Sequence, residues 1–215
     1  MADLIVKTAL AYLLGNLMGG QVIGWLRGGI DLRSVGSGNI GATNALRTQG
    51  TGFALGVLAI DVLKGVVAAL AIPLLPALGT SLLAASEQAY VCGVAVAVGH
   101  CYPVLHGFHG GKGVATLAGV FGALLIAALG WMLAVFALLV MLTGYVSLAT
   151  LGAAATAIVW VASMSSGGLA SPAGAFTLAM SALVVWKHRE NIGRLLQGNE
   201  NRFEKARVLG RWLRR

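Results

Sequence analysis

Charge is scarce in this sequence: Asp, Glu, Lys and Arg make up 10% of its 215 residues. A soluble domain carries roughly a quarter charged residues, so this chain has too few to cover a water-facing surface. Carboxylates are especially rare, with seven Asp and Glu against 15 Lys and Arg. The scarcity of charge excludes an ordinary soluble domain.

Cysteine is also nearly absent. Cys92 and Cys101 fall within or at the end of one apolar run, are too few for a disulfide framework, and read as small buried hydrophobes. Cys101 lies near His100, His106 and His109, but no carboxylate accompanies them and the spacing is not a recognised zinc pattern. We expect no metal and no cofactor. For these four residues we prefer a structural or phosphate-facing role to metal binding. A Cys101–His nucleophile pair has only sequence adjacency in its favour.

The chain is rich in apolar residues. They make up 58% of the chain and recur in runs of about the length that crosses a bilayer. We therefore predict an all-α polytopic membrane protein with about seven transmembrane helices, the first retained and not cleaved as a signal peptide. The expected spans are residues 4–23, 51–70, 88–105, 114–129, 132–148, 151–164 and 173–186. The last four are short, so five spans with two re-entrant segments remain an alternative.

The basic residues predict the orientation. The connections after the first and third spans and the C-terminal tail contain Lys or Arg, and the connection after the fifth span, which would lie on the same side, contains none. The connections after the second, fourth and sixth spans contain none either. The positive-inside rule places the basic set in the cytoplasm and the N-terminus outside. Nine of the 15 Lys and Arg lie in residues 187–215, a basic cytoplasmic juxtamembrane tail after a transmembrane domain of residues 1–186. A tail in this place indicates anionic lipid headgroups and argues against nucleic acid as a partner.

The first polar motif is residues 36–47, Gly-Ser-Gly-Asn-Ile-Gly-Ala-Thr-Asn-Ala-Leu-Arg, between two apolar runs. Its glycines free backbone N–H groups, its Ser, Thr and Asn side chains add donors, Arg47 adds charge, and no carboxylate is present. A loop with these donors, leading into a helix at about Thr51, suits an oxyanion such as phosphate. The alternative is a solvated turn between two membrane helices.

The second motif lies within residues 99–116 and surrounds Lys112 with Gly110, Gly111 and Gly113, just where a helix is expected to begin. Backbone N–H groups, the positive end of a helix and an ammonium would converge there on an anion. It is not a nucleotide P-loop, because His106 stands at the first glycine position and Gly113 replaces the Mg²⁺-binding hydroxyl residue. We therefore reject an ATPase.

Three further features are polar. His188 and Asn191 would share a helical face after the last span, where a basic membrane anchor explains the neighbouring arginines but explains these two less well. Ser147, expected at the inner end of the fifth span, suits either a local helix bond or a substrate contact. Asp61 and Lys64 lie three apart in the second span, and we prefer a buried ion pair to a catalytic role for them.

Taken together, two motifs suited to phosphate groups meet one membrane face. Such a site indicates either an organic- or lipid-phosphate transporter, or an enzyme that joins a soluble phosphate to a lipid-phase one. A transporter needs a path to the outer face, yet the outer loops lack basic residues.

The motifs resemble those of the bacterial acyl-phosphate-dependent glycerol-3-phosphate acyltransferases (PlsY). The resemblance covers nearly the whole chain, in order and with matching spacing. It rests on Ser-Gly-Asn-Ile-Gly-Ala-Thr-Asn at 37–44 with Arg47, Gly-His at 99–100 with Pro103, Gly-Gly-Lys-Gly-Val-Ala-Thr at 110–116, and His188-x-x-Asn191. Two shorter features also look like those of the family, namely Tyr145-Val-Ser147 and Asp61-x-x-Lys64-Gly65.

The resemblance implies transfer of a fatty acyl group from acyl phosphate to the 1-hydroxyl of glycerol 3-phosphate. The products would be 1-acyl-glycerol 3-phosphate (lysophosphatidic acid) and phosphate, in the first step of phospholipid synthesis. Acyl phosphate would come from the bilayer and glycerol 3-phosphate from the cytoplasm, at a multi-pass protein of the bacterial inner membrane whose active site faces the cytoplasm. The oligomeric state stays open, a monomer included.

The resemblance also carries roles over to residues. The glycerol-phosphate and catalytic set is Ser37, Arg47, Lys112, His188 and Asn191. The substrate-binding set is Gly38, Asn39, Gly41, Thr43, Asn44, His100, Gly110, Gly111, Gly113, Thr116 and Ser147. The chain departs from the family pattern where His109 and Gly144 stand at places that often hold basic residues, and at residues 15–18. We expect direct acyl transfer without an acyl-enzyme, with the proton taken by the substrate phosphate or by His188.

Overall fold

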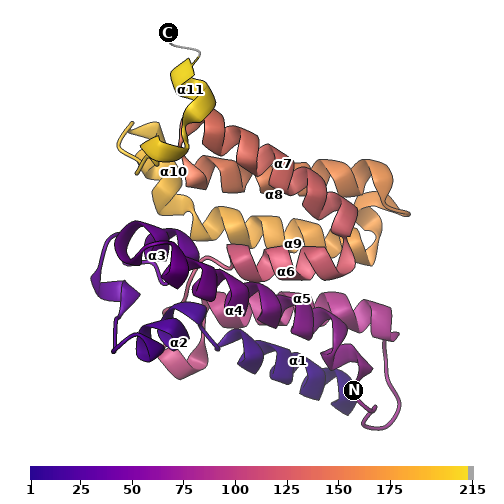
Figure 1. Ribbon diagram of the computed structural model, residues 1–215. Coiled ribbons are helices and arrows are strands. Elements are labelled where there is room, and N and C mark those ends of the chain that lie inside the picture. Colours follow the sequence, from indigo (N-terminus) through magenta and orange to yellow (C-terminus); the bar gives the residue numbers. More distant parts are fainter. Residues whose placement is uncertain (213–215) are drawn as a thin grey trace. The chain divides into compact units, whose positions relative to one another are not determined.

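The computed structural model describes residues 1–212, and every regular element in that range is a helix, as predicted. The chain forms two compact units, Met1–Leu124 and a second that begins at Leu125 (Figure 1). The sequence-based division between residues 186 and 187 stays a prediction. The last three residues of the predicted basic tail, 213–215, lie outside the described residues.

The first unit is built around α4 and α5. Helix α1 packs along α5, while α2, α3, α5 and α6 all contact α4. In chain order the elements are α1 (Ala2–Gly15), α2 (Gly19–Leu26), the 3-10 turn η1 (Leu32–Ser34), α3 (Ala42–Gln49), α4 (Thr51–Leu70), η2 (Ile72–Leu74), α5 (Ala85–Cys101), η3 (Val104–His106) and α6 (Val114–Leu124).

Glycine permits the close approach of α4 and α6. A Cβ on Gly65 would overlap with the Thr116 carbonyl oxygen, and one on Gly119 would overlap with that of Val62. Small residues at such crossings let membrane helices gain van der Waals contact along their backbones. The crossing fixes the start of α6, and with it the residues just before α6.

An apolar cluster anchors the short helix α3 to α4. Leu32, Ala45 and Phe53 are buried together with Ala54 and Val57, and Leu46 packs against them. The cluster joins η1, α3 and α4, so the polar residues between η1 and α3 are held at both ends by buried contacts. A solvated turn would not need this support.

The second unit consists of three long helices and the C-terminal segment. Helix α7 packs on α8, α8 packs on α9, α10 contacts both α8 and α9, and α11 lies against α7. The elements are α7 (Ile126–Thr143), α8 (Val146–Met164), η4 (Gly168–Ala170), α9 (Pro172–Lys187), α10 (Arg189–Leu196), η5 (Glu204–Ala206) and α11 (Val208–Trp212).

By length and composition, four helical segments of residues 1–212 could cross a membrane, or five if the bent pair α1 and α2 forms one span. Helices α6 and α9 are apolar but shorter. These seven segments lie in the regions where the sequence predicted seven spans. The membrane-protein class is therefore supported, while the number seven and the orientation stay predictions.

Three predicted boundaries are wrong. The first span is broken near Leu17, with a bend of 45° between α1 and α2. The fifth span begins at Ile126, so Gly130 lies inside α7 and not in a reversal. Ser147 lies in the first turn of α8, because Gly144 adopts a left-handed conformation (φ 77°) and ends α7. In each case the prediction misjudged whether a glycine within an apolar run interrupts the helix.

Candidate active site

The Ser37 loop, residues 36–41, connects η1 to α3. Asn39 Oδ1 accepts a hydrogen bond from the Gly41 amide at 3.0 Å. The sequence predicted the following helix at about Thr51, but α3 begins at Ala42, so Thr43, Asn44 and Arg47 are helical residues. Ser37, Gly38, Thr43 and Arg47 are all exposed. The loop therefore offers its donors at the start of a short helix, as a phosphate site requires.

Asn44 organises the Ser37 loop from inside. Its amide nitrogen donates to the carbonyl oxygens of Leu32, Val35 and Asn39 at 3.0, 3.0 and 2.8 Å, and its oxygen accepts from the Ser37 amide at 2.9 Å. The side chain is buried. Asn44, expected to bind substrate, thus has its amide group engaged with the loop backbone, which makes it a support of the loop.

The carboxylate nearest to this loop in sequence is already paired. Arg33 donates to both oxygens of Asp31, from Nε and from its terminal nitrogen, at 2.9 to 3.1 Å. The side-chain and backbone hydrogen bonds from Arg33 lower the pKa of the Asp31 carboxyl below its usual range. Asp31 therefore remains ionised at neutral pH and is poorly suited to act as a proton donor.

The Lys112 loop, residues 110–113, directly precedes α6, as predicted. It lies against the end of α5: the Gly111 amide donates to the His100 carbonyl at 3.1 Å, and a Cβ on Gly110 would overlap with that same oxygen. Gly113 has φ 77° and lies beside Cys101. The glycines are thus needed for close packing of the loop on α5, and Lys112 is half-buried.

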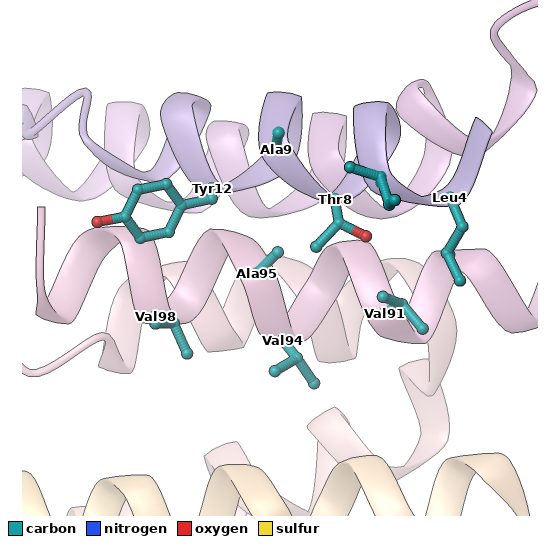
Figure 2. Close-up of a pocket in the computed structure, with 9 residues that line it drawn as sticks. Leu4, Thr8, Ala9, Tyr12, Val91, Val94, Ala95 and Val98 are labelled. Carbon is teal, nitrogen blue, oxygen red and sulfur yellow. The ribbon is translucent and has the colours of Figure 1, made fainter. Parts of the chain in front are cut away.

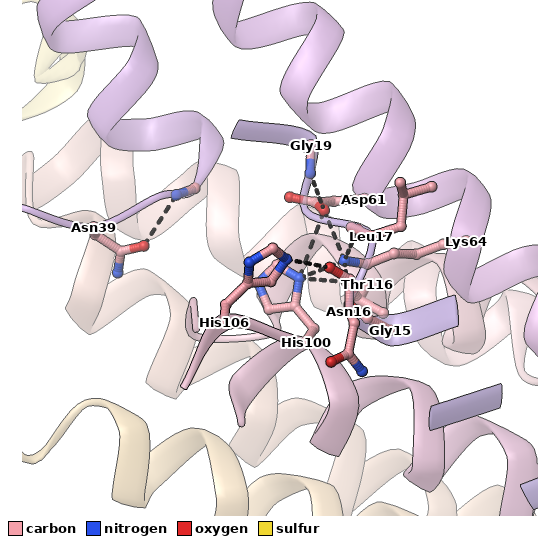
Figure 3. A network of polar contacts seen from close by, with 11 residues as sticks. Gly15, Asn16, Leu17, Gly19, Asn39, Asp61, Lys64, His100, His106 and Thr116 are labelled. Atoms are coloured by element: carbon pink, nitrogen blue, oxygen red, sulfur yellow. Dashed lines mark hydrogen bonds and ion pairs between the residues drawn. The ribbon is translucent and has the colours of Figure 1, made fainter. Parts of the chain in front are cut away.

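His100 and Thr116, both expected to bind substrate, lie in a buried polar cluster beside the Lys112 loop. Thr116 Oγ1 is 3.3 Å from His100 Nδ1, and Lys64 Nζ is 2.7 Å from the same nitrogen (Figure 3). The predicted ion pair between Asp61 and Lys64 is confirmed at 2.9 Å. Both side chains expected to touch substrate therefore have protein partners inside the first unit.

The histidines near Cys101 do not gather into a metal site. His106 Nε2 lies 3.1 Å from the Asn16 carbonyl, and His109 Nδ1 lies 2.6 Å from the Gly107 carbonyl. Among residues 1–212, no group of three or more His, Cys, Asp or Glu side chains is placed to hold a metal ion. Each of these two rings has one nitrogen engaged by the backbone.

In the second unit, Ser147 and Asn191 are joined by a carboxylate. Glu200 Oε1 accepts from Ser147 Oγ at 3.0 Å and from Asn191 Nδ2 at 2.6 Å, while Arg194 Nε donates to Oε2 at 2.7 Å. Burial alone would raise the pKa of the Glu200 carboxyl, but the hydrogen bonds from Asn191, Arg194 and Ser147 lower it overall. The sequence prediction of Ser147 and Asn191 as site residues missed Glu200, which connects them.

Glu200 was missed because its signal in the sequence is weak. It is one acidic residue in a polar, basic segment, nine positions after Asn191. The tail is brought back by Phe203, whose amide donates to the Gly144 carbonyl at 2.8 Å, and by Arg202, whose guanidinium lies 4.6 Å from the centre of the Tyr145 ring. Only the fold of the tail shows that Glu200 meets α8 and α10.

His188 lies between α9 and α10, two helices that run in different directions (Figure 1). The predicted shared face of His188 and Asn191 assumed that the last helix continues, but α9 ends at Lys187 and α10 begins at Arg189. The His188 side chain is buried, and Nδ1 lies 2.8 Å from the Val184 carbonyl. Since a carbonyl only accepts, the neutral ring carries its proton on Nδ1 and its lone pair on Nε2. This tautomer is the one that a general base acting through Nε2 requires.

An apolar groove of about 610 Å³ lies between α1 and α5 (Figure 2). Leu4, Thr8 and Tyr12 line it from α1, and Val91 and Val98 line it from α5. The Tyr12 hydroxyl donates to the Tyr102 carbonyl at 2.7 Å. The lining contains no charged side chain, so the groove is apolar and unsuited to bind a phosphate.

The comparisons with known proteins agree with one another. Residues 5–198 match the family model described as Glycerol-3-phosphate acyltransferase. Curated relatives named glycerol-3-phosphate acyltransferase include one from Geobacter sulfurreducens, 40% identical over 95% of this chain and 100% of its own length. Another, from Syntrophotalea carbinolica, is 43% identical over the same shares. The chain belongs to the glycerol-3-phosphate acyltransferase family.

Solved structures of the family show the same fold. A crystal structure of PlsY (YgiH), an integral membrane glycerol 3-phosphate acyltransferase in its glycerol 3-phosphate form, matches with a TM-score of 0.82 and 36% identity. It covers 96% of this chain and 98% of its own. The lysophosphatidic acid form matches with a TM-score of 0.81 and 34% identity, over the same shares. Membership of this family decides between the enzyme and the transporter in favour of the enzyme.

Proposed function

We propose that this acyltransferase moves a fatty acyl group from acyl phosphate to the 1-hydroxyl of glycerol 3-phosphate, releasing lysophosphatidic acid and phosphate. The observation that carries the proposal is the family match over residues 5–198, joined to two glycine-rich loops that each precede a helix. The two solved relatives were crystallised in glycerol 3-phosphate and lysophosphatidic acid forms, an acceptor and a product of this reaction.

The donors of the first unit suit the charge that develops in the reaction. As the hydroxyl oxygen forms a bond to the acyl carbon, the bond from that carbon to the phosphate oxygen breaks, and negative charge grows on the carbonyl oxygen and on the departing phosphate. Arg47, Lys112 and the backbone amides of their loops are the groups we propose to stabilise that charge. Ser37, Asn39 and Thr43 would orient the phosphate-bearing substrates.

Two groups are suited to take the hydroxyl proton. The phosphate oxygens of the acyl donor can accept it directly and leave as protonated inorganic phosphate. His188 is the other, because hydrogen bonding at Nδ1 leaves the lone pair on Nε2. In both cases the acyl group passes directly to glycerol 3-phosphate, without an ester on Ser37. In the second unit, Asn191 would belong with His188 to the catalytic set, and Ser147 would contact the substrate.

The membrane placement is part of the proposal. We infer an inner-membrane protein with seven crossings, its N-terminus outside and its motif-bearing loops in the cytoplasm. The reason is that Arg27, Arg33, Arg47 and Lys112 all lie in the connections after the first and third spans, which are on the same side of the membrane. Acyl phosphate would then enter from the bilayer among apolar helices, and glycerol 3-phosphate from the cytoplasm.

The test is a reaction with purified protein in lipid nanodiscs, supplied with acyl phosphate and glycerol 3-phosphate. The proposal predicts lysophosphatidic acid in wild-type samples. Lys112→Ala should lower the rate by about 10²-fold or more. Removing one hydrogen-bond donor to the charge that develops in a transition state has an effect of this size in other enzymes. Lys205→Ala, which removes an exposed tail cation, is the matched control and should leave the rate unchanged. Wild-type protein that is folded and yields no lysophosphatidic acid contradicts the proposal.

A further inference from the structure

Three ionisable side chains meet in the interior of the first unit, away from any exposed surface. Asp61 and Lys64 come from adjacent turns of α4, and His100 comes from the last turn of α5 (Figure 3). Their exposed fractions are 1%, 3% and 3%. Asp61 Oδ1 lies 2.9 Å from Lys64 Nζ and 3.5 Å from His100 Nδ1. Charges inside a membrane helix are costly, so a cluster of this kind calls for a role.

Polar contacts at Nδ1 hold the His100 ring in place. Lys64 Nζ lies 2.7 Å from His100 Nδ1, and an ammonium group has donors but no acceptor. Nδ1 is therefore the ring atom that meets the Lys64 amine, and Thr116 Oγ1 lies 3.3 Å from the same nitrogen. Lys64 also donates to the carbonyl oxygens of Leu17 at 2.7 Å and Gly15 at 3.1 Å. The cluster thus fixes the orientation of the His100 ring.

The Nε2 side of His100 faces the Lys112 loop. A Cβ on Gly111 would overlap with Nε2, and the Gly111 amide donates to the His100 carbonyl at 3.1 Å. The loop therefore follows the surface of the His100 residue, ring and backbone together. Lys112 comes directly after Gly111, so a change in the position of the His100 ring would move Lys112.

The opposite side of the cluster holds the start of α2. The Gly19 amide donates to Asp61 Oδ1 at 3.2 Å, and the carbonyls that Lys64 binds lie at the break between α1 and α2. Gly20 then lies directly against the Ser37 loop, because a Cβ on Gly20 would overlap with the Ile40 carbonyl. One buried cluster therefore contacts the supports of both anion-binding loops of this unit.

We propose that Asp61, Lys64 and His100 are positioning residues, which hold the Ser37 loop and the Lys112 loop in the conformation that binds the phosphate groups of the substrates. None of the three contacts substrate. His100 acts on the Lys112 loop, and Asp61 and Lys64 act on the Ser37 loop through α2. This inference rests on the proposed function, because the loops matter to catalysis only if they bind the substrates.

The first unit contains a matched control. Asp3 and Lys7 form a second buried ion pair at 3.2 Å, with side-chain exposures of 6% for Lys7 and 1% for Asp3. Lys7 donates to the Pro73 carbonyl, and Asp3 accepts from Gln88 and from the Leu78 amide. All these partners lie in residues 73–88, so loss of this pair removes a buried interaction without touching either anion-binding loop.

The experiment compares Asp61→Asn and His100→Leu with Asp3→Asn in purified full-length protein. Hydrogen–deuterium exchange is measured for both loops, alongside kcat and KM for glycerol 3-phosphate. We expect at least tenfold faster exchange in the Lys112 loop for His100→Leu, and in the Ser37 loop as well for Asp61→Asn. We expect a fall of about 10- to 100-fold in kcat/KM for both, since misplacing a catalytic group by about 1 Å costs up to 10²-fold. Asp3→Asn should speed exchange only in residues 73–88 and keep kcat/KM within about twofold.

A second variant at the same position guards against simple misfolding. His100→Asn keeps an acceptor for Lys64 but lacks the Nε2 edge, so it should fold and still show the faster exchange of the Lys112 loop. Unchanged exchange in both loops for the folded variants overturns the inference, as does an equal loss of kcat/KM in Asp3→Asn. If wild-type protein proves inactive, the proposed function fails, while the exchange comparison still decides whether the cluster positions the loops.

Discussion

Replacing Glu200 with glutamine keeps the size of the side chain and removes its charge. In the wild-type protein, Glu200 accepts from Ser147, Asn191 and Arg194 within 3.0 Å. The glutamine can present its oxygen to Ser147 and Asn191, but its NH₂ group would then face the Arg194 donor. Glu200→Gln therefore loses one charge-assisted bond and weakens two others.

The magnitude follows from these contacts. A hydrogen bond to a charged group contributes about 1.5–3 kcal/mol, and neutral bonds are about half as strong. The Arg194 side chain is 34% exposed and can form hydrogen bonds to water instead. The loss of its bond to Glu200 should therefore cost an amount near the lower end of that range. We expect a total destabilisation of about 2–3 kcal/mol. For a chain of this size that corresponds to a fall of roughly 4–12 °C in the unfolding midpoint.

The assay is thermal unfolding of the purified protein in detergent micelles. Glu204→Gln is the control, because Glu204 is 58% exposed and lies 3.5 Å from Arg202, so its charge contributes less than about 1 kcal/mol. We expect a clear fall in midpoint for Glu200→Gln and almost none for Glu204→Gln. Equal midpoints for the two variants would refute the role assigned to the Glu200 carboxylate.

The pH dependence of this difference has a defined sign. The pKa of Glu200 is lowered in the folded state, so its charge adds stability above the unfolded pKa of about 4.3. That stability is lost as the pH falls through the folded pKa. The gap in midpoint between wild-type and Glu200→Gln protein should therefore be full at pH 6–7 and shrink below about pH 4.

Three further predictions concern the loops, the helix packing and the proton. Asn44→Ala removes four hydrogen bonds from the Ser37 loop, and should lower stability by about 2–4 kcal/mol and weaken glycerol 3-phosphate binding measured by calorimetry. Gly65→Ala should lower the unfolding midpoint by an amount equivalent to about 1–3 kcal/mol, because its Cβ would overlap with the Thr116 carbonyl. His188→Ala should lower kcat by about 10²–10⁴-fold in steady-state assays if His188 takes the proton.

Each of these has its own control. Asn39→Ala removes a single bond of the same loop and should cost less stability than Asn44→Ala. Gly130→Ala introduces a Cβ into open space and should be neutral, and a loss equal to that of Gly65→Ala would count against the close α4–α6 packing. A fall in kcat of less than tenfold for His188→Ala would assign proton removal to the substrate phosphate.

Much of the fold could be predicted because apolar runs and charge carry a strong signal. The all-helical membrane class followed from the scarcity of charge, and the pairing of Asp61 with Lys64 followed from their spacing on one helix face. The Lys112 loop was correctly placed before a helix, because its glycines end where the apolar run from Val114 begins.

What could not be predicted depended on glycines within apolar runs and on contacts between distant segments. Gly144 ends α7 and Gly130 does not interrupt it, although both are single glycines in apolar sequence. The return of the tail joins Glu200 to Ser147, 53 positions away, which no local pattern records. For the same reason His100, read as a substrate contact, is found beside Lys64 in the interior.

The most direct test of the proposed reaction follows phosphate release and lysophosphatidic acid together, with and without glycerol 3-phosphate, in one purified sample supplied with acyl phosphate. Direct transfer predicts one phosphate for each lysophosphatidic acid, and no rapid release of phosphate when glycerol 3-phosphate is left out. A burst of phosphate without glycerol 3-phosphate, accompanied by an acyl ester on Ser37, would contradict it.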